Sequence, residues 1–438
     1  MSKSEGNVDG AMNNNREELP VNASPDERMD AARQLHLDLT GDSDENFDLE
    51  RLWNWRLSRV RQQIHKLELD CMVLYDPVNI RYATGASTMP VFSLHFRDRY
   101  CFIGRSGPVV FFEKPHWSHL TKGSGRVDEV RDRVSCRAVT GGPHLTSNIS
   151  RWIDDIKDLS RNWGNGSQRI AMDHCEFALA FALKDQGFDV LDAQEPMEQA
   201  RAVKSADELY CMRVALSTAE HGMHKMHGQL RPGITENQLW AIVAETNLAY
   251  GGEWLECRLL TSGQRTNPWL QEPSDRAVSA GELVAFDTDL IGPYGYCADI
   301  SRTWFCEPGK PSARQKTLFG LAKEEIQHNT ALLRSGVTLR EVAQNAWKVP
   351  SEFSESSYAF IAHGVGLCDE WPNCYRLSRL LDQDEGDIEL QPGMTLCVES
   401  YIGEVGGPDG VKLEEQVVIT ETGSNLMSRF PFDPLLEN

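Results

Sequence analysis

The carboxyl-terminal half of the chain contains very little histidine, because only His328 and His363 occur beyond residue 228. The eleven cysteines include no C-x-x-C pair, which argues against a disulfide framework and favours free thiols in a reducing compartment. No apolar run is long enough to span a bilayer, and the amino terminus lacks the apolar segment of a secretory signal. These absences predict a cytoplasmic protein with no membrane partner.

Positive charge is also scarce, because 44 Lys and Arg residues accompany 65 Asp and Glu residues and the net charge is -21. Nucleic acids and anionic membranes are bound through basic surfaces, so neither is expected as a partner. The glycines form no G-x-x-x-x-G-K-S/T phosphate loop, which argues against a nucleotide enzyme. At 438 residues, the chain is long enough for two or three domains with large cores.

Composition divides the chain into three parts. Residues 1–45 are polar and acidic, and we expect them to be largely disordered or extended, with a short docked helix around Ala31–Leu39. Residues 46–200 predict an α/β domain, which begins with an amphipathic helix at Arg51–Leu69 and a strand at Cys71–Tyr75. Residues 201–438 have a different plan and form the third part.

The third part repeats one plan of elements. Capping boxes open predicted helices at Ser205, Thr235 and Thr338. Each pair of helices is followed by strands, first around Leu283–Phe305 and then over the two strands that close the chain. Two successive helix–helix–hairpin units predict a pseudo-symmetric fold in which helices cover the outside of a mixed or antiparallel sheet.

The segment Leu283–Phe305 carries three acids that a hairpin brings together. Strand alternation places Asp287 and Asp289 on one face, and a turn about Tyr294 places Asp299 opposite Asp289. Directly opposed residues of an antiparallel pair have Cβ atoms about 5 Å apart, where like charges destabilise one another. Three such carboxylates require raised pKa values or a bound cation, unless they simply face water.

Further candidate ligands lie downstream. His363 lies in a glycine-rich stretch that allows close approach of the backbone, and Glu399 ends the run Pro392-Gly-Met-Thr-Leu-Cys-Val-Glu399. The last predicted strand carries two adjacent acids, and strand periodicity does not decide whether Glu414 or Glu415 faces inward. Together these residues predict a carboxylate-rich site with one imidazole.

This order of motifs resembles the pita-bread metallohydrolase family, which includes methionine aminopeptidase, prolidase and creatinase. The stretch Asp76–Gly85 is similar to the creatinase-type amino-terminal domain. The resemblance implies an α+β fold, with a creatinase-like α/β amino-terminal domain followed by a pseudo-symmetric pita-bread catalytic domain. It also implies that two divalent metal ions are held by a set of five ligands: Asp289, Asp299, His363, Glu399 and Glu414.

The sequence departs from the peptidases of this family at two positions. Those peptidases carry a histidine shortly after the H-G-x-G motif, where this chain has Asp369, and another upstream of the metal hairpin, where it has Trp269. Both histidines help to bind the peptide and to stabilise charge during amide hydrolysis. Their replacement argues against peptide cleavage.

A closer resemblance is to the dimethylsulfoniopropionate lyases of this superfamily. It rests on five segments: Gly251–Glu256, Arg265–Trp269, Phe286–Gly292, His363–Pro372 and Phe430–Pro434. Those enzymes split a sulfonium zwitterion into dimethyl sulfide, acrylate and a proton. The resemblance implies that Asp287 is a sixth metal ligand, that Asp369 is the base and that Tyr358 lies at the substrate. It favours iron, although Mn, Zn and Co suit the same donor set.

The fixed charge of a sulfonium is bound well by aromatic faces, at about 1–2 kcal/mol when desolvated. Besides Tyr358, the aromatic residues available for this are Trp254, Trp269, Trp371 and Tyr296. Creatinase-like relatives are dimers, so a homodimer is expected. The alternatives are a pita-bread hydrolase, acting on a Xaa-Pro peptide or a creatine-like molecule, and a non-catalytic binding protein.

Overall fold

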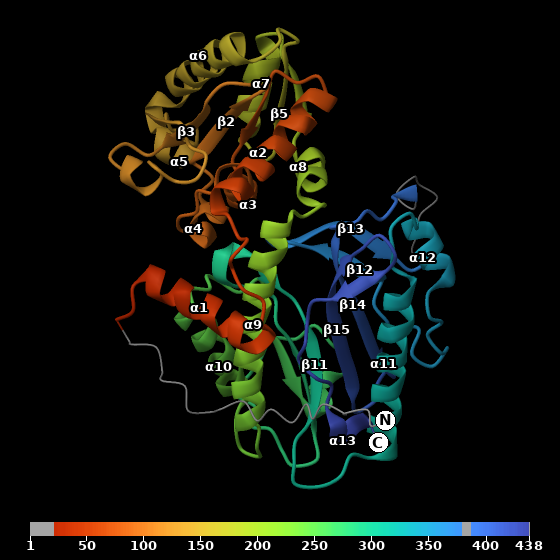
Figure 1. The fold of residues 1–438 in the computed structure, drawn as a ribbon. Coiled ribbons are helices and arrows are strands. Elements are labelled where there is room, and N and C mark those ends of the chain that lie inside the picture. Colours follow the sequence, from red (N-terminus) through yellow and green to blue (C-terminus); the bar gives the residue numbers. More distant parts are fainter. Residues whose placement is uncertain (1–21, 379–386, 438) are drawn as a thin grey trace.

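The computed structural model describes residues 22–378 and 387–437, which form an amino-terminal domain and a larger carboxyl-terminal domain (Figure 1). The amino-terminal domain is built on a six-stranded mixed sheet in the order β4-β3-β2-β1-β5-β6. β1 pairs antiparallel with β2 and parallel with β5. The strands are Cys71–Leu74 (β1), Tyr100–Gly104 (β2), Val109–Glu113 (β3), Glu129–Asp132 (β4), Arg169–Met172 (β5) and Asp189–Asp192 (β6).

Helices cover both faces of this sheet (Figure 1). Successive side chains of a strand point to opposite faces, so Met72 of β1 joins the core under α2 and Val73 joins the core under α6. α8 then leads from this domain to the long helix α9. The helices are Leu49–Lys66 (α2), Pro77–Thr84 (α3), Pro90–His95 (α4), Ala138–Gly141 (α5), Leu145–Trp163 (α6), Phe177–Asp185 (α7) and Gln194–Arg201 (α8).

The carboxyl-terminal domain contains sheets in the orders β11-β8-β7, β13-β12-β14-β15-β16 and β10-β9. The first two meet where the Thr303 hydroxyl donates to the Lys412 carbonyl (2.8 Å) and accepts from its amide (3.0 Å). The strands are Leu259–Ser262 (β7), Leu283–Asp287 (β8), Leu290–Ile291 (β9), Cys297–Ala298 (β10), Ser301–Phe305 (β11), Phe360–Val365 (β12), Asp369–Tyr375 (β13), Thr395–Gly403 (β14), Gly410–Ile419 (β15) and Ser424–Leu426 (β16).

Helices α9 and α10 lie on one side of these strands, and α11 and α12 lie on the other (Figure 1). The capping boxes predicted at Ser205, Thr235 and Thr338 are all present. The order of two helices and then strands occurs twice, as predicted. The helices are Ala206–Gln229 (α9), Glu236–Ala249 (α10), Ala313–Leu332 (α11), Leu339–Asn345 (α12) and Pro434–Glu437 (α13). Among the residues that the structure describes, no helix is both long and apolar enough to cross a membrane.

The expectation of a largely disordered or extended segment over residues 1–45 needs correction within its described part. α1 spans Pro25–Thr40, so the short helix expected around Ala31–Leu39 is longer at its amino end. It begins at a capping box formed by Ser24 and Glu27, and it ends at Gly41 in the left-handed conformation. Its buried side chains dock on α9, where His36 Nδ1 lies 2.9 Å from Ser217 Oγ. Residues 1–21 lie outside the described part.

Candidate metal centre

The hairpin of β8 and β11 places three acids together. Asp287 at the end of β8 pairs with Ser301 of β11, and β9 and β10 continue in the same register. Asp289 and Asp299 therefore lie opposite one another between the two ladders. Asp289 has a φ of 40°, so the strand is interrupted there and the carboxylate is presented from left-handed backbone. One oxygen from each of the three acids lies within 4.8 Å of the others.

The second sheet brings the remaining predicted ligands to the same place. Glu399 of β14 and Glu414 of β15 are directly paired, and His363 lies on the neighbouring strand β12. His363 Nε2 lies 3.4 Å from an oxygen of Asp299, 3.6 Å from Glu399 and 3.4 Å from Glu414. All six predicted ligands are buried in one cluster, which two different sheets supply.

Glu414 and Glu415, between which the strand period did not choose, face opposite ways. Glu414 faces the carboxylates. Glu415 forms an ion pair of 2.8 Å with Arg302 and accepts a hydrogen bond from Ser428. Glu415 is therefore paired outside the cluster, whereas Glu414 is part of it.

Lys412 is a member of the cluster that the sequence analysis missed. Its fully buried Nζ lies 3.3 Å from Asp287, 3.0 Å from Glu399 and 3.0 Å from Glu414. It also donates a hydrogen bond of 2.8 Å to Ser301. The signal was present, because Lys412 and Glu414 are two residues apart on β15 and must share a face.

Cys397 is a second residue that was missed. Its sulfur lies within 4.8 Å of donor atoms of Asp299, His363 and Glu414. It precedes Glu399 by two positions on β14, so the same period of two places both side chains on one face. A thiol therefore borders the centre on the side of His363.

The cluster is electrostatically unfavourable without a cation. Burial raises the pKa values of Asp289 and Asp299 well above the ordinary range, and neighbouring carboxylates raise them further. Burial also raises the pKa of Asp287 to about 6 and that of Glu399 to about 7, although Lys412 lowers both. Burial would likewise raise the pKa of Glu414, but Lys412 and His363 hold it below its ordinary value.

Unpaired oxygens show that the centre fits a metal. Asp287 Oδ1 and Asp299 Oδ1 are buried, and neither has a hydrogen-bond partner in the part of the chain that the structure describes. A buried anionic oxygen without a partner is costly, and a cation relieves the cost. Carboxylates with one imidazole form a hard to borderline donor set, which suits divalent first-row metals.

Asp369 lies at the edge of the cluster, at the start of β13. Its Oδ1 is 3.8 Å from His363 Nδ1, and its side chain is 57% exposed. Partial burial raises the pKa of Asp369, as does the charge of Glu414, while His363 acts against the shift. Asp369 is thus a carboxylate beside the candidate ligands that remains accessible from outside.

Two of the aromatic residues considered for binding the sulfonium, Tyr358 and Trp269, lie on the Lys412 side of the cluster. The Lys412 Nζ is 5.2 Å from the ring centroid of Tyr358, so this ring already faces a cation. Tyr358 stacks on Tyr401 at 6.3 Å between centroids, and Tyr401 stacks in turn on the buried Trp269 at 6.4 Å. Trp269 therefore supports the ring of Tyr358 through Tyr401.

The other aromatic candidates have partners outside the cluster. Trp254 donates to Glu256 (3.1 Å), and the Arg81 guanidinium lies 5.5 Å from its ring centroid. Trp371 packs against the core of the carboxyl-terminal domain. Tyr296 is buried and donates to Glu208 (3.0 Å), so its side chain is held in the interior.

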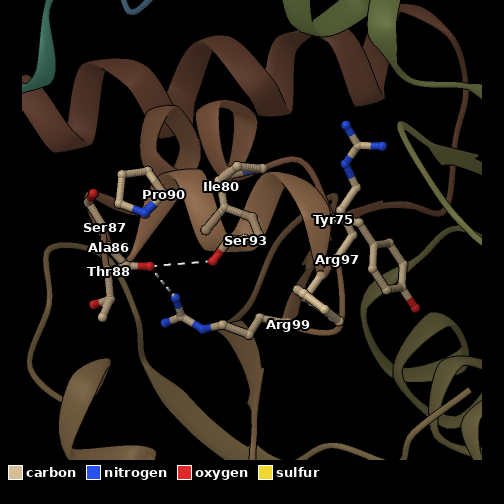
Figure 2. Close-up of a pocket in the computed structure, with 11 residues that line it drawn as sticks. Tyr75, Ile80, Ala86, Ser87, Thr88, Pro90, Ser93, Arg97 and Arg99 are labelled. Carbon is tan, nitrogen blue, oxygen red and sulfur yellow. Dashed lines mark hydrogen bonds between the residues drawn. The ribbon is translucent and has the colours of Figure 1, made fainter. Parts of the chain in front are cut away.

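The pocket in Figure 2 lies in the amino-terminal domain, away from the carboxylates. It lies between α3 and α4, where the carbonyl of Thr88 accepts from Arg99 (3.0 Å) and Ser93 (3.4 Å). None of the candidate metal ligands lines it. The candidate centre is therefore identified by its donor groups and not by the shape of a cavity.

Comparison with known proteins shows two matching domain families. Residues 56–203 match the Creatinase/Prolidase N-terminal domain, and residues 210–421 match metallopeptidase family M24. The Xaa-Pro dipeptidase from Bacillus anthracis superposes with a TM-score of 0.69 at 19% identity, covering 86% of this chain and 98% of its own. The predicted fold class, a creatinase-like domain followed by a pita-bread domain, is confirmed.

Two curated relatives are similar over most of their length. Dimethylsulfoniopropionate lyase DddP from Roseovarius nubinhibens is 35% identical over 397 residues, which cover 89% of this chain and 88% of the relative. The protein of the same name from Roseobacter denitrificans is 36% identical over 394 residues, with 89% and 88% coverage.

Proposed function

Because the chain belongs to the dimethylsulfoniopropionate lyase family DddP, and is thus a lyase, we propose that it splits dimethylsulfoniopropionate into dimethyl sulfide, acrylate and a proton. The observation that carries the proposal is an accessible carboxylate, Asp369, 3.8 Å from the imidazole of a buried acidic cluster. A carboxylate base beside a cation-binding centre suits removal of a proton next to a substrate carboxylate.

We propose that two divalent metal ions are held by a set of six residues: Asp287, Asp289, Asp299, His363, Glu399 and Glu414. Family M24 is metal-dependent, and the unpaired oxygens of the cluster support this assignment. Five carboxylates less the one positive charge of Lys412 leave four negative charges, which two divalent cations neutralise. The lyase resemblance favours iron, and Mn, Zn and Co are compatible with the donors.

Different residues of the chain have different roles in the β-elimination. A bound divalent metal supplies Lewis-acid stabilisation of the negative charge that develops at the substrate carboxylate. Asp369 takes the proton from the carbon next to that carboxylate. The electron pair of this C–H bond forms the double bond of acrylate, and the C–S bond breaks so that its electrons leave with neutral dimethyl sulfide. The face of Tyr358 holds the sulfonium until it leaves.

We further propose a cytoplasmic homodimer. Creatinase-like relatives are dimers, and the surface around α4 carries a group of exposed apolar side chains, of the kind that marks an interface. They are Met89, Val91, Phe92 and Phe96, each 40–46% exposed. The resemblance implies a second copy of this chain as partner, and we propose that the partner binds at this surface.

The proposed activity is tested by headspace gas chromatography of dimethyl sulfide over purified, metal-loaded protein supplied with dimethylsulfoniopropionate. We expect dimethyl sulfide and acrylate in equal amounts. The same protein is also given Xaa-Pro dipeptides and guanidino acids, which should remain intact. A fully metallated protein that releases no gas but hydrolyses one of these substrates would replace the lyase by a hydrolase.

Replacement of Tyr358 tests the binding of the sulfonium. Because an aromatic face contributes about 1–2 kcal/mol to the binding of a desolvated cation, Tyr358→Ala should raise KM by about tenfold. Tyr358→Phe keeps the ring and should leave KM close to the wild-type value. Steady-state kinetics of the two variants makes the comparison. An equal rise in both would assign the effect to the hydroxyl, and no rise in Tyr358→Ala would place the sulfonium elsewhere.

A further inference from the structure

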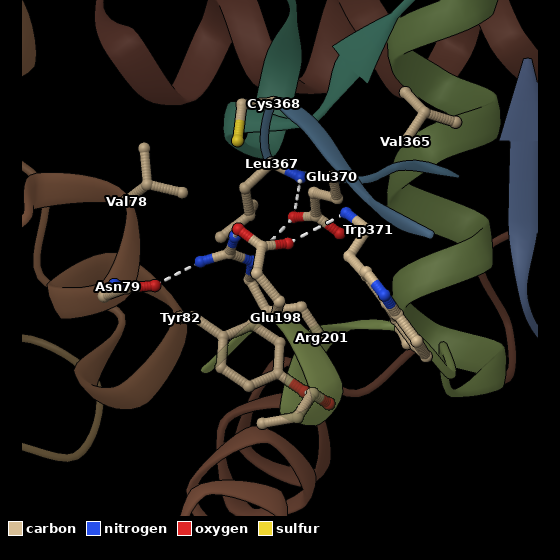
Figure 3. Close-up of polar contacts among 12 residues, drawn as sticks. Val78, Asn79, Tyr82, Glu198, Arg201, Val365, Leu367, Cys368, Glu370 and Trp371 are labelled. Atoms are coloured by element: carbon tan, nitrogen blue, oxygen red, sulfur yellow. Dashed lines mark hydrogen bonds and ion pairs between the residues drawn. The ribbon is translucent and has the colours of Figure 1, made fainter. Parts of the chain in front are cut away.

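The turn that carries Asp369 is closed by the side chain of the next residue, Glu370. The Glu370 carboxylate accepts a hydrogen bond of 2.9 Å from the amide of Leu367. A Cβ at Gly366 would overlap the same carboxylate, so glycine is needed there for the turn to close. Figure 3 shows Glu370 beside Leu367 and Cys368 at this turn. Asp369, the first residue of β13, follows the turn directly, and the side chain of its neighbour Glu370 holds the turn closed.

Two buried cations hold the carboxylate of Glu370, on the face of β13 opposite to Asp369. Arg201 Nε lies 3.0 Å from one of its oxygens, and Lys204 Nζ lies 3.0 Å from the other. The side chains of all three residues are at most 3% exposed. Glu198 pairs with Arg201 and accepts from the amide of Trp371 (2.9 Å), so two carboxylates balance two cations.

The same network reaches into the amino-terminal domain. Arg201 donates a hydrogen bond to the side-chain oxygen of Asn79 on α3 (Figure 3). Asn79 in turn donates to the buried Asp173 (3.1 Å), which follows β5. A continuous chain of polar contacts therefore joins the core of the amino-terminal domain to the residue beside Asp369.

Because the two residues are neighbours on one strand, holding the Glu370 side chain also sets the orientation of Asp369. Successive residues of a strand point to opposite faces, so fixing the Glu370 side chain fixes the direction in which Asp369 is presented. The two residues differ as expected, because the Asp369 side chain is 57% exposed and that of Glu370 is 1% exposed. The exposed acid has no ion pair of its own within 3.5 Å among the described residues, and its partner at 3.8 Å is His363. Its position therefore depends on the backbone of the turn.

We propose that Glu370, clamped by Arg201 and Lys204, is a positioning residue for Asp369, and that Asn79 couples the amino-terminal domain to it through Arg201. The proposal rests on the proposed function, in which Asp369 takes the substrate proton. A base displaced by about 1 Å costs as much as 100-fold in rate. Glu370 touches neither the substrate nor the candidate metal ligands in this assignment, so its effect is confined to the turnover step.

The test compares Glu370→Gln with the double variant Glu370→Gln, Lys204→Met. The single variant leaves one buried positive charge without a partner, whereas the double variant restores the balance of charge without restoring the clamp. Both should lower kcat by about 10- to 100-fold with KM and metal content unchanged. Only the single variant should also show a clear loss of thermal stability. Asn79→Ala should also lower kcat, but by less than the two Glu370 variants.

Hydrogen–deuterium exchange gives a readout that is independent of activity. In both Glu370 variants, peptides that cover residues 364–372 should exchange faster than in wild type. The matched control is Glu113→Gln, which removes a buried ion pair with Arg99 (2.7 Å) in the amino-terminal domain and should leave that segment unchanged.

Unchanged exchange over residues 364–372, or full recovery of kcat in the double variant, would overturn the proposal. If the wild type releases no dimethyl sulfide, the proposed function fails while the exchange measurement still decides whether Glu370 holds the turn.

Discussion

Replacing Asp369 by asparagine should lower the release of dimethyl sulfide by about a thousandfold, which lies within the range that a general base contributes. Asparagine has nearly the same shape and accepts hydrogen bonds, but it does not take a proton at neutral pH. Asp369 lies beside the candidate ligand His363 but is 57% exposed, so the substitution should leave the buried cluster intact. We therefore expect the bound metal to remain at the wild-type level.

The measurement is dimethyl sulfide by gas chromatography, with metal content determined on the same samples. Asp189→Asn is the control, because it changes another exposed aspartate (64% of the side chain) in the amino-terminal domain. It should keep full activity. If Asp369→Asn retains its metal and more than about a tenth of wild-type turnover, a different residue must act as the base.

The acids of the hairpin could be predicted from the sequence because strand alternation and hairpin register are local properties. The register about Tyr294 placed Asp299 opposite Asp289, and the structure has that register. What the pattern could not show is the interruption of the strand at Asp289, where φ is 40°. Alternation alone treats this residue as ordinary strand, although its carboxylate reaches the cluster from left-handed backbone.

Contacts between distant segments limited the rest of the prediction. Lys412 reaches Asp287 only because β15 packs beside the hairpin of β8 and β11, a contact over more than a hundred residues. The choice between Glu414 and Glu415 depends likewise on Arg302, which holds Glu415 away from the cluster. Residue type and local period supply the candidates, and packing between the two sheets decides which of them meet.

The aromatic candidates also show that a local sequence pattern does not contain the contacts between distant segments. From the sequence, Trp254, Trp269 and Trp371 are candidates, beside Tyr358, for binding the sulfonium. In the structure, Trp269 is only 6% exposed and supports Tyr358 through Tyr401, and Trp371 packs against the core. Whether an aromatic ring fills a core or lines a site depends on its neighbours in space, which a local pattern does not contain.

Exchanging Asp299 for asparagine should remove the bound metal and, with it, the activity. Asp299 is the one acid that belongs to both groups of donors, with Asp287 and Asp289 on one side and His363 and Glu414 on the other. Its Oδ1 is buried without a hydrogen-bond partner in the described part of the chain. An amide has one neutral oxygen where the carboxylate has two that share a negative charge, so a ligand common to both groups is lost.

Metal content by mass spectrometry should fall from two ions per chain to near zero in Asp299→Asn, and dimethyl sulfide should become undetectable. Asp70→Asn is a matched control, because both acids are 2% exposed but Asp70 lies in the amino-terminal domain and accepts backbone amides of the loop before β5. The control should keep its metal even if its stability falls. A folded Asp299→Asn protein with two ions still bound would contradict the assignment of Asp299 as a shared ligand, because loss of a ligand common to both groups must weaken both sites together.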